Sequence, residues 1–508
     1  MSEYGNVIIK NTDDITPPVT SGGLWENREA AYHIYDLPGV PKCSIAVIGY
    51  NRLEKTRYCV ECILKCTIDI DYELILIDNG SSDGTLEFFE SVEYDKKKII
   101  KVTKNIGAPY GVNTAINTFI GKYLVIVTND VYVTKNWLSN LLKCYESDPK
   151  IGFVAPVSSN VSNLQEVDLK FENFNEMQQK AAIFNESDPK KWERRIRLLN
   201  IITVFSRPIL DIVGSFDPAY VHDFLEDDFA MRIRRQGYKL ILCKDTWVCH
   251  DHNLSIGEDK DLMAYRASLE SGRRIYKEKY NGLDAWDDTN NFEEALLQPI
   301  DTIRFKNTNL SSLIIEPRLG TPIFEICNKL KGRDIDDVTT HAFITRAKYF
   351  TDLQYAADTV KCDRMDFIQS HYANSSFDII ACCEPINIYG APITFLQRLY
   401  DFLKPGGILL FKLRNTNDYN SLLRAAGLGG KTDADMPSSI TPEEIIEILK
   451  IFGGIGIKLM HEMEPMQQDH QKELLELLKT LKPHAGRSEL TRSITKDFCF
   501  KVEKGAIL

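Results

Sequence analysis

Apolar runs of strand length alternate with segments of helical spacing from residue 42 onward. The strands predicted from these runs cover residues 43–48, 73–77, 99–102 and 123–127. The helices predicted between them cover residues 52–66 and begin near residues 86 and 110. Runs such as 123–127 are typical of strands buried on both faces of a parallel sheet. Successive strand–helix units of this kind predict an α/β fold built on a doubly wound sheet.

Polar stretches interrupt this pattern at three places. Residues 1–40 are polar and turn-rich, and we interpret them as an N-terminal arm. Residues 160–200 are polar and charged, and we interpret them as an insertion. Residues 283–308 are acidic and rich in asparagine, which predicts a linker. The expected organisation is a first domain at residues 41–282 and a second α/β domain at residues 309–508.

Composition narrows the class of protein. A chain of 508 residues suits at least two domains, since one domain takes roughly 100–200 residues. The 61 basic and 72 acidic residues leave a net charge of -11, which argues against a nucleic-acid partner. The N-terminus lacks the pattern of a signal peptide, and no apolar run has the length of a membrane span. We therefore expect a cytoplasmic protein without a transmembrane segment.

Three of the 12 cysteines have the spacing of a motif. Cys59, Cys62 and Cys66 fall on one face of the predicted helix, beside the apolar residues Val60 and Ile63. This pattern favours buried thiols on a helix face over a metal or cluster site.

Polar clusters directly follow three predicted strands. These clusters are Tyr50-Asn51-Arg52, the turn from Asp78 to Thr85, and Thr128-Asn129-Asp130. A single acid after a strand more often caps a turn or a helix, but three clusters at one edge of a parallel sheet favour a ligand site. A carboxylate such as Asp130 can bind a divalent cation that neutralises a diphosphate.

Taken in order, these motifs resemble those of the GT-A glycosyltransferases of family 2, over about residues 41–255. The motifs that carry the resemblance are Tyr50-Asn51-Arg52, Asp78 to Thr85, Asn105-x-Gly107 to Asn113, Thr128-Asn129-Asp130, Val213 to Asp217, Leu225 to Phe229, Arg232 to Tyr238, and His250. The resemblance implies inverting transfer of a hexosyl or N-acetylhexosaminyl group from a nucleotide-sugar donor, with a UDP-sugar favoured.

The resemblance also implies which residues bind the donor. Asp78 would hold the nucleotide base, with Tyr50 beside it, and Asp83 would support the turn that binds the ribose. The whole set of expected donor-binding residues is Tyr50, Asn51, Arg52, Asp78, Ser81, Asp83, Asn105, Gly107, Asn113 and Asn129.

A metal site is implied at the end of the strand at residues 123–127. Asp130 would be the last acid of the family's DxD motif, but Thr128 stands at the first position, which predicts weaker metal affinity. His250 matches the histidine that completes the metal or diphosphate site, and His252 competes for that role. Mn²⁺ or Mg²⁺ is the expected cofactor.

The acids Glu226, Asp227 and Asp228 match the position of the family's catalytic base. Inverting transfer needs one carboxylate to deprotonate the acceptor while the nucleoside diphosphate leaves from the opposite face. Asp227 completes a Glu-Asp pair and is slightly favoured, whereas counting back from Arg232 puts Glu226 in the usual register of the base. Both residues stay candidates, and acids at a helix N-terminus are also favourable without any catalytic role.

The second half resembles class I S-adenosylmethionine-dependent methyltransferases over about residues 311–415. The segments that carry this resemblance are Phe377 to Ile380 and Phe402 to Leu410, which includes the turn Pro405-Gly406-Gly407. In that family a glycine-rich loop after the first strand cradles the cofactor. Here the loop from Glu316 to Pro322 keeps one glycine and contains prolines, and no acid can be assigned after a second strand. We therefore expect a degenerate, non-catalytic domain that does not bind S-adenosylmethionine.

These inferences predict a metal-dependent glycosyltransferase that acts on a glycan or on a protein such as flagellin. The second domain would dock the acceptor, a partner or a second copy of the chain. Two alternatives stay open. One is a bifunctional enzyme that transfers a sugar and then methylates it. The other is a non-catalytic module that binds sugar nucleotides or proteins.

Overall fold

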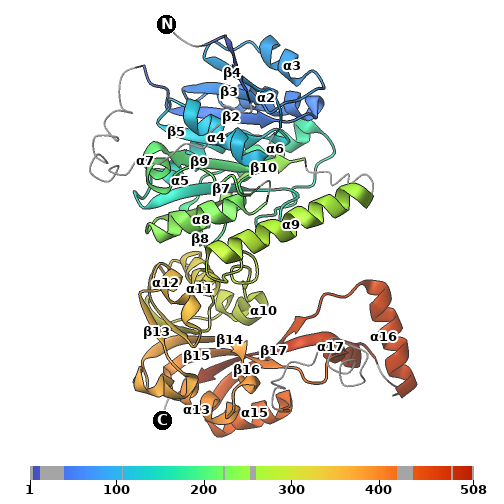
Figure 1. Ribbon diagram of the computed structural model, residues 1–508. Helices are drawn as coiled ribbons and strands as arrows, with labels where there is room; N and C mark the ends of the chain where they lie inside the picture. The colour runs from blue at the N-terminus through green and yellow to red at the C-terminus, as the bar shows by residue number, and fades with distance from the viewer. Residues whose placement is uncertain are drawn as a thin grey trace. The chain divides into compact units, whose positions relative to one another are not determined.

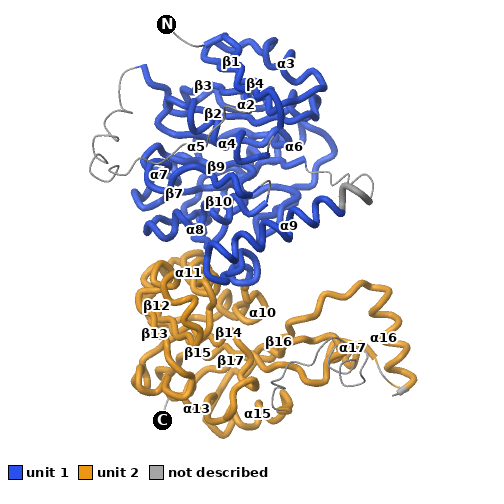
Figure 2. The backbone as a smooth tube through the Cα atoms, in the orientation of Figure 1, with its two compact units in different colours: residues 1–290 blue, residues 291–508 orange. Residues whose placement is uncertain are grey.

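The chain divides into two compact units, residues 1–290 (unit 1) and residues 291–508 (unit 2), which Figure 2 shows in blue and orange. The computed structural model describes residues 4–11, 39–105, 107–220, 223–251, 259–419, 439–481, 484 and 486–505. The boundary at residue 290 lies within the predicted linker at 283–308.

Unit 1 is an α/β domain (Figure 1). Its strands are β1 (Val7–Lys10), β2 (Cys43–Gly49), β3 (Tyr72–Asp78), β4 (Lys97–Val102), β5 (Tyr123–Thr128), β6 (Val131–Tyr132), β7 (Ile151–Ser158), β8 (Trp192–Arg195), β9 (Ile202–Ser206) and β10 (Lys239–His250). Its α-helices are α2 (Leu53–Cys66), α3 (Thr85–Ser91), α4 (Ala108–Thr118), α5 (Trp137–Tyr145), α6 (Phe174–Phe184), α7 (Arg207–Val213), α8 (Leu225–Arg235) and α9 (Asp259–Lys279).

The sheet of unit 1 has the strand order β1-β4-β3-β2-β5-β9-β7-β10-β6, with β8 paired to β10. Strands β1, β4, β3, β2 and β5 are mutually parallel. The apolar runs predicted as strands lie at its centre, where Ile45, Leu76 and Val125 are fully buried. Helices cover both faces of such a sheet, so nearly every position of a central strand must be apolar. The predicted doubly wound α/β fold is confirmed.

Two polar segments contribute to the sheet, contrary to expectation. β1, from the expected N-terminal arm, pairs in parallel with β4 at the edge of the sheet. β8, from the expected insertion at residues 160–200, pairs antiparallel with β10. Both strands have four residues: β1 is an isolated apolar run, Val-Ile-Ile-Lys, inside a polar stretch, and β8 is largely charged. Short or charged strands are common at the margin of a sheet. The hydrophobic pattern therefore did not identify them as strands.

Cys59 and Cys62 are fully buried on α2, and Cys66 is partly buried. Burial raises the pKa of the Cys62 thiol to about 12, with a further increase from Cys66. Protonated thiols packed in a core act as small apolar side chains. The interpretation of this cluster as buried helix-face thiols is confirmed.

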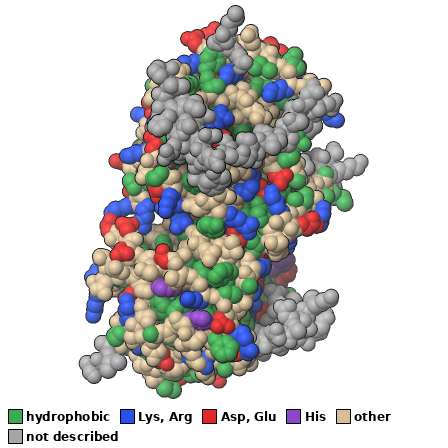
Figure 3. All heavy atoms as spheres, turned by 60° about the vertical axis from the view of Figure 1, so that its left-hand side comes forward, with side chains coloured by type: hydrophobic (Ala, Val, Ile, Leu, Met, Phe, Trp, Pro, Cys, Tyr) green, Lys and Arg blue, Asp and Glu red, His purple; other side chains and the backbone are tan. Residues whose placement is uncertain are grey.

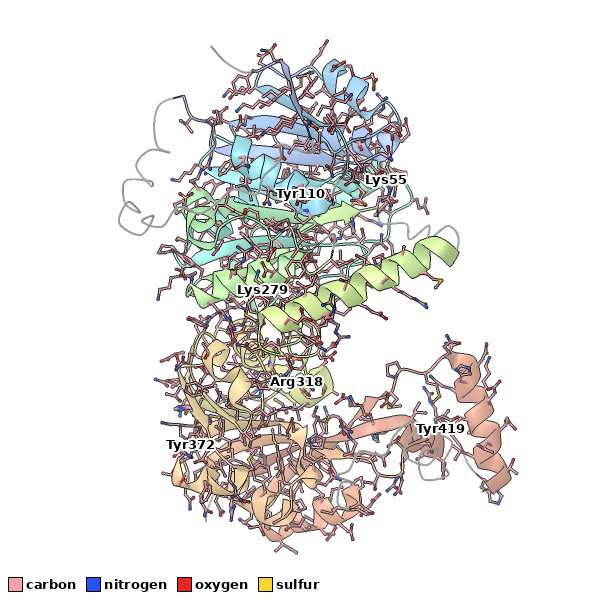
Figure 4. All side chains as sticks on the ribbon, viewed as in Figure 1. Lys55, Tyr110, Lys279, Arg318, Tyr372 and Tyr419 are labelled. Carbon is pink, nitrogen blue, oxygen red and sulfur yellow. The ribbon has the colours of Figure 1, made fainter. Side chains whose placement is uncertain are left out.

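Asp228 anchors α8 to α9. Its carboxylate lies 2.6 Å from Lys279 Nζ and accepts hydrogen bonds from the Tyr280 hydroxyl (2.7 Å) and from Arg232 Nε (2.9 Å). Figure 4 labels Lys279 at the end of α9. The Asp228 side chain is fully buried, so its charge depends on these partners for compensation.

Unit 2 is a second α/β domain (Figure 1). Its strands are β11 (Asn309–Ile315), β12 (Asp337–Ile344), β13 (Thr359–Cys362), β14 (Phe377–Pro385), β15 (Leu403–Arg414), β16 (Gly454–Met463) and β17 (Thr495–Lys504). Its α-helices are α10 (Glu294–Leu297), α11 (Thr321–Lys331), α12 (Phe350–Leu353), α13 (Pro392–Phe402), α15 (Pro442–Ile451), α16 (Gln468–Leu481) and α17 (Arg487–Ile494).

The sheet of unit 2 has the order β13-β12-β11-β14-β15-β17-β16. Its first five strands are parallel, and β17 runs antiparallel to both β15 and β16. Gly406 has φ +78° in the predicted turn, and a Cβ atom on Gly407 would lie 2.9 Å from the Phe377 carbonyl oxygen. The second α/β domain predicted from the sequence is confirmed.

Part of the expected linker belongs to unit 2. Leu296 and Leu297 of α10 are fully buried, and Glu293 lies 2.7 Å from the buried Lys412. Residues 291–308 therefore pack onto the second sheet, although their sequence is largely polar.

Replacing Asp228 with asparagine should destabilise unit 1 by about 2 kcal/mol, because it removes the buried carboxylate that binds Lys279, Arg232 and Tyr280. All five tryptophans lie within residues 1–290, so denaturant unfolding followed by tryptophan fluorescence reports on unit 1 alone. Glu87→Gln on the exposed face of α3 is the control and should leave the midpoint unchanged. If Asp228→Asn unfolds at the same denaturant concentration as wild type, the contacts of Asp228 do not stabilise unit 1.

Candidate active site

The first unit gathers polar side chains at the carboxyl ends of its parallel strands. Gly49 of β2 is in register with Asp78 of β3, and Ile48 is in register with Thr128 of β5. The residues that follow these strands therefore meet at one edge of the sheet, where ligands of such folds bind. The three clusters singled out in the sequence lie together there.

The loops after β2 and β3 are bound to each other. The Asn51 N–H donates to Ser81 Oγ (2.9 Å), and Asn51 Oδ1 accepts from the Ser82 N–H (3.0 Å). Asn51 and Arg52 both have left-handed φ values, 54° and 60°. Left-handed backbone at two successive non-glycine residues is costly and persists only where surrounding contacts require it. The hydrogen bonds of Asn51 with Ser81 and Ser82 are contacts of this kind.

Asp83 caps two helices with one carboxylate. Its Oδ2 accepts from the Leu53 N–H at the start of α2 (2.8 Å), and its Oδ1 accepts from the Thr85 hydroxyl at the start of α3 (2.6 Å). Burial alone would raise the pKa of Asp83, but these hydrogen bonds outweigh it and lower the pKa. Asp83 therefore fixes the shape of the turn between Asp78 and Thr85.

Asp78 is fully buried at the end of β3. Its Oδ1 accepts the Ser81 N–H (2.8 Å), whereas its Oδ2 has no hydrogen-bond partner within the described part of the chain. Buried carboxylate oxygens are almost always hydrogen-bonded. A ligand with an N–H or O–H group at this position would complete the coordination of Asp78.

Asn105 orders the loop before α4. Its Oδ1 accepts from Asn79 Nδ2 (3.2 Å) and from the Gly107 N–H (2.9 Å). Gly80 has φ +82°, and a Cβ atom there would lie 2.7 Å from the Asn105 backbone nitrogen. The two loops can approach this closely only with glycine at position 80.

Two of the expected donor-binding residues are occupied by internal hydrogen bonds. Asn113 is buried and pairs both of its amide atoms with the Phe216 backbone, each at 2.9 Å. Asn129 Nδ2 donates to the Asn51 carbonyl (3.2 Å) and to the Thr56 hydroxyl (2.8 Å). Both asparagines hold loops together, which differs from the expected contact with a donor. Tyr50, by contrast, is 47% exposed.

The structure brings Asp130 and His250 together. His250 Nε2 lies 3.6 Å from Asp130 Oδ1, because His250 pairs with Val131 in the β6–β10 ladder. Arg52 Nη1 lies 3.4 Å from Asp130 Oδ2. His252 lies outside the described residues. Asp251 directly follows His250, and its carboxylate lies 3.2 Å from Lys55 of α2, which Figure 4 labels.

The ring of His250 is oriented as that of a metal ligand can be. Its Nδ1 lies 3.2 Å from the Asn160 carbonyl oxygen, which can only accept a hydrogen bond, so Nδ1 is the donor. The other ring nitrogen, Nε2, faces Asp130. Histidines that bind metals are commonly oriented in this way. Within the described residues, however, no group of three or more His, Cys, Asp or Glu side chains could hold an ion.

The acidic residues of α8 differ in their contacts. Asp227 forms an ion pair with Arg197 in which both side chains are buried. Glu226 is partly buried and has no ion-pair partner within the described part of the chain. Burial, and then the Asp227 carboxylate, raise the pKa of Glu226 to about 7, although Arg197 acts in the opposite direction. A carboxylate with a pKa near neutrality suits general acid–base catalysis.

Arg197 is the principal residue of this site that sequence reasoning missed. It lies between β8 and β9, in the polar stretch interpreted as an insertion. No motif or apolar pattern marks it, and its partner Asp227 lies 30 residues further along the chain. Only the folded structure brings the two residues together.

At the corresponding edge of unit 2, the chain's own side chains form an ion-pair network. The buried Glu316 accepts from the Thr345 N–H (2.6 Å) and lies 3.2 Å from Arg346 Nη2. Arg346 also binds Glu384. Glu316 and Arg318 have φ values of 54° and 52°, in the loop that the sequence predicted to be a poor cofactor cradle.

On the face shown in Figure 3, basic side chains lie among acidic and apolar ones. In the described part of the chain, no helix combines the length and apolar character needed to cross a bilayer.

Comparison with known proteins agrees with the motifs of unit 1. Residues 44–195 match the family model described as glycosyl transferase family 2. An uncharacterized glycosyltransferase of Bacillus subtilis, YfnE, is 29% identical over 111 residues, which cover 22% of this chain and 28% of YfnE. The glycosyltransferase AglE of Haloferax volcanii is 23% identical over 214 residues, 42% of this chain and 67% of AglE. The chain thus matches less than a third of the length of YfnE.

Solved structures resemble each half of the chain only distantly. A mannosyltransferase from Pyrobaculum calidifontis, solved with GDP-Man and Mn²⁺, has a TM-score of 0.35 and 18% identity over 51% of this chain and 72% of its own. A SAM-dependent methyltransferase from Archaeoglobus fulgidus has a TM-score of 0.30 and 14% identity over 46% of this chain and 99% of its own. TM-scores this low add nothing to the assignment of either unit.

Proposed function

We propose, from the glycosyl transferase family 2 segment at residues 44–195, that the chain is an inverting, metal-dependent glycosyltransferase. It transfers a hexosyl or N-acetylhexosaminyl group from a nucleotide-sugar donor to a glycan or protein acceptor. The observation that carries this proposal is the shared sheet edge, where the incompletely paired Asp78 carboxylate follows β3 and the Asp130–His250 pair follows β5 and β10.

Asp78 is the residue that selects the donor's base. Its unpaired Oδ2 can accept a hydrogen bond from a ring N–H, which uracil, thymine and guanine present and adenine and cytosine lack. Among these bases, the resemblance of the motifs to family 2 favours a UDP-sugar. The ordered turn that Asp83 holds lies beside it and suits the ribose. The exposed ring of Tyr50 can cover the face of the base. Asn113 and Asn129 support these loops from behind.

Asp130 and His250 are the residues that would hold a divalent cation, Mn²⁺ or Mg²⁺. A cation held there would supply positive charge to the departing diphosphate. Asp130 and His250 are the two side chains that would hold it, and oxygen and nitrogen donors of this kind suit Mn²⁺ or Mg²⁺. Arg52 lies close to the same carboxylate and, together with Thr128 in place of an acid, weakens the affinity for metal.

Glu226 is the preferred catalytic base. Its carboxylate takes the proton of an acceptor hydroxyl while the acceptor oxygen forms a bond to the anomeric carbon. The bond from that carbon to the diphosphate oxygen breaks on the opposite face, so the configuration inverts. The sequence slightly favoured Asp227, but Asp227 is held by Arg197, whereas Glu226 has no ion-pair partner among the described residues. Burial raises the pKa of both carboxyl groups, so the difference between them lies in the ion pair.

Unit 2 is proposed to be non-catalytic. A cofactor at the carboxyl edge of its sheet would need close approach to the loop after β11, where Pro317 and Arg318 stand. Glu316 and Glu384, which could receive its polar groups, are already bound to Arg346. The residues present do not fit S-adenosylmethionine. Docking of the acceptor, which includes proteins such as flagellin, or self-association is the proposed role of this unit.

Donor identity is tested by nucleotide release from a panel of UDP-, GDP- and dTDP-sugars with the full chain. We expect release from a UDP-sugar, and loss of nucleotide binding in Asp78→Asn, because the substitution changes the polarity of the buried acceptor. Asp71→Asn, at an exposed position paired with Lys96, is the control. Equal binding of UDP by Asp78→Asn and by wild type would contradict the assigned role.

Glu226→Gln should lower kcat by roughly 100-fold or more with little change in KM for the donor, because it removes only the proton acceptor. Asp227→Asn should cost less, and Asp211→Asn on α7 should behave as wild type. The measurement is steady-state transfer, together with NMR of the product anomer. A dead Asp227→Asn beside an active Glu226→Gln would reverse the choice of base, and a retained configuration would reject the mechanism.

Excess chelator should abolish transfer, and Mn²⁺ or Mg²⁺ should restore it. Asp130→Ala should weaken Mn²⁺ binding in the presence of UDP by at least about tenfold, since even an outer partner of a metal ligand has effects of that size. Electron paramagnetic resonance of Mn²⁺ measures this without turnover, with Asp71→Asn again as the control. Full activity in chelator would refute the requirement for a cation.

Titration of the full chain with S-adenosylmethionine in a calorimeter should give no heat of binding at micromolar concentrations. UDP with Mn²⁺, titrated into the same preparation, shows that the protein is competent to bind. Transfer of label from methyl-labelled cofactor to the glycosylated product would overturn this expectation and support the bifunctional alternative.

A further inference from the structure

The three acids at the start of α8 point in different directions, because successive residues of a helix are about 100° apart. Asp228 is bound by Lys279 and Tyr280, and Asp227 is bound by Arg197. Glu226 alone has no ion-pair partner in the described part of the chain. Arg197 thus binds Asp227, the acid that directly follows the proposed catalytic base.

Hydrogen bonds fix the position of Arg197 from the side opposite Asp227. Its carbonyl oxygen accepts from Asn163 Nδ2 (3.1 Å), and Asn163 Nδ2 also donates to Gln165 Oε1 (2.9 Å). Gln165 Oε1 in turn accepts from the Leu199 N–H (2.7 Å). The backbone that carries Arg197 is therefore bound to residues 163–165.

The same segment also holds the proposed metal ligand. The Ser158 N–H donates to the Gln165 carbonyl (3.1 Å). Ser159 Oγ and Asn160 Nδ2 both donate to the carbonyl of His250, at 3.2 and 2.9 Å. Residues 158–165 thus contact His250 at one end and the Arg197 backbone at the other.

We propose that Arg197 is a positioning residue for the acid pair: its guanidinium binds Asp227 and leaves Glu226 as the carboxylate available to the acceptor. This inference rests on the proposed function, because it assigns to Glu226 the role of base. Arg197 itself is buried and acts through Asp227.

Because both side chains are buried, the ion pair between Arg197 and Asp227 is sensitive to the loss of either partner. Two buried charges are tolerated as a pair, but removing one partner leaves the other uncompensated. Without Arg197, no cation would offset the charge of the two acids. Glu226 and Asp227 would then compete for ionisation, since neighbouring carboxylates resist simultaneous ionisation.

The arrangement predicts a specific pH effect. The groups that face Glu226 are Asp227, Asp223 and Arg197, and Tyr265 of α9 also senses its charge. Asp227 raises the pKa of Glu226 and Arg197 lowers it. A base works only when deprotonated, so activity rises as pH passes through this pKa. Loss of Arg197 should therefore move the acidic limb of the pH profile to higher pH.

The test compares Arg197→Gln, Arg197→Lys and the double variant Arg197→Gln/Asp227→Asn in the full chain. Arg197→Gln should raise the acidic-limb pKa of kcat/KM by about one unit. Arg197→Lys, which keeps the charge, should restore much of the wild-type profile. The double variant removes both buried charges, so it should fold, and its pKa should return towards that of wild type because the two opposing effects are lost together.

Arg195→Gln is the matched control. Arg195 is a buried arginine two residues away that pairs with Glu193, so its loss tests the general effect of removing a buried cation. It should leave the pH profile unmoved. Infrared titration of the carboxylates, with Glu226→Gln as the reference for subtraction, follows Glu226 without any turnover.

The two measurements separate the two proposals. An upward shift of the Glu226 titration in Arg197→Gln supports the role of Arg197, even if the chain transfers no sugar. If the titration shifts and the acidic limb of an active enzyme does not, Glu226 is not the base, and the proposed mechanism fails. An unmoved Glu226 titration in a folded Arg197→Gln overturns the inference about Arg197.

Discussion

Concentrating negative charge at one edge of a sheet is the constraint on which unit 1 depends. Asp78, Asp83 and Asp130 lie at or just after the ends of its strands, Asp227 lies in the first turn of α8, and most of them are buried. Each like charge destabilises its neighbours unless a partner compensates it. Asp83 accepts hydrogen bonds from backbone N–H groups. Asp130 has Arg52 and His250 beside it, and Asp227 is bound by Arg197.

This compensation is incomplete at several acids. Asp78 Oδ2 and Asp227 Oδ2 are buried without a hydrogen-bond partner in the described part of the chain, and Glu226 has no ion-pair partner there. Under the proposed function, Asp78 accepts a group of the ligand and Glu226 accepts the substrate proton. Unit 2 presents the opposite case: Arg346 binds both Glu316 and Glu384, so its own side chains satisfy the carboxyl edge of its sheet.

The sequence was sufficient for the central fold, because burial on both faces imposes a continuous apolar pattern on strands such as β2, β3 and β5. It also identified the motifs that follow those strands. It was insufficient at the margins of the sheet. β1 is a run of four residues inside a polar stretch, β8 is short and largely charged, and α10 packs onto unit 2 from within a polar stretch. None of the three has the length and pattern of a buried element.

By itself the sequence determined that Asp78 and Asp130 stand after apolar strands and that Glu226 and Asp227 begin a helix, because that order is written in the chain. It left the choice within the last pair open, and it did not show the internal hydrogen bonds that Asn113 and Asn129 make. Only the tertiary structure decided which partners surround these residues. The environment of a carboxylate is set by charges distant in sequence, and Arg197 reaches Asp227 only after the sheet has formed.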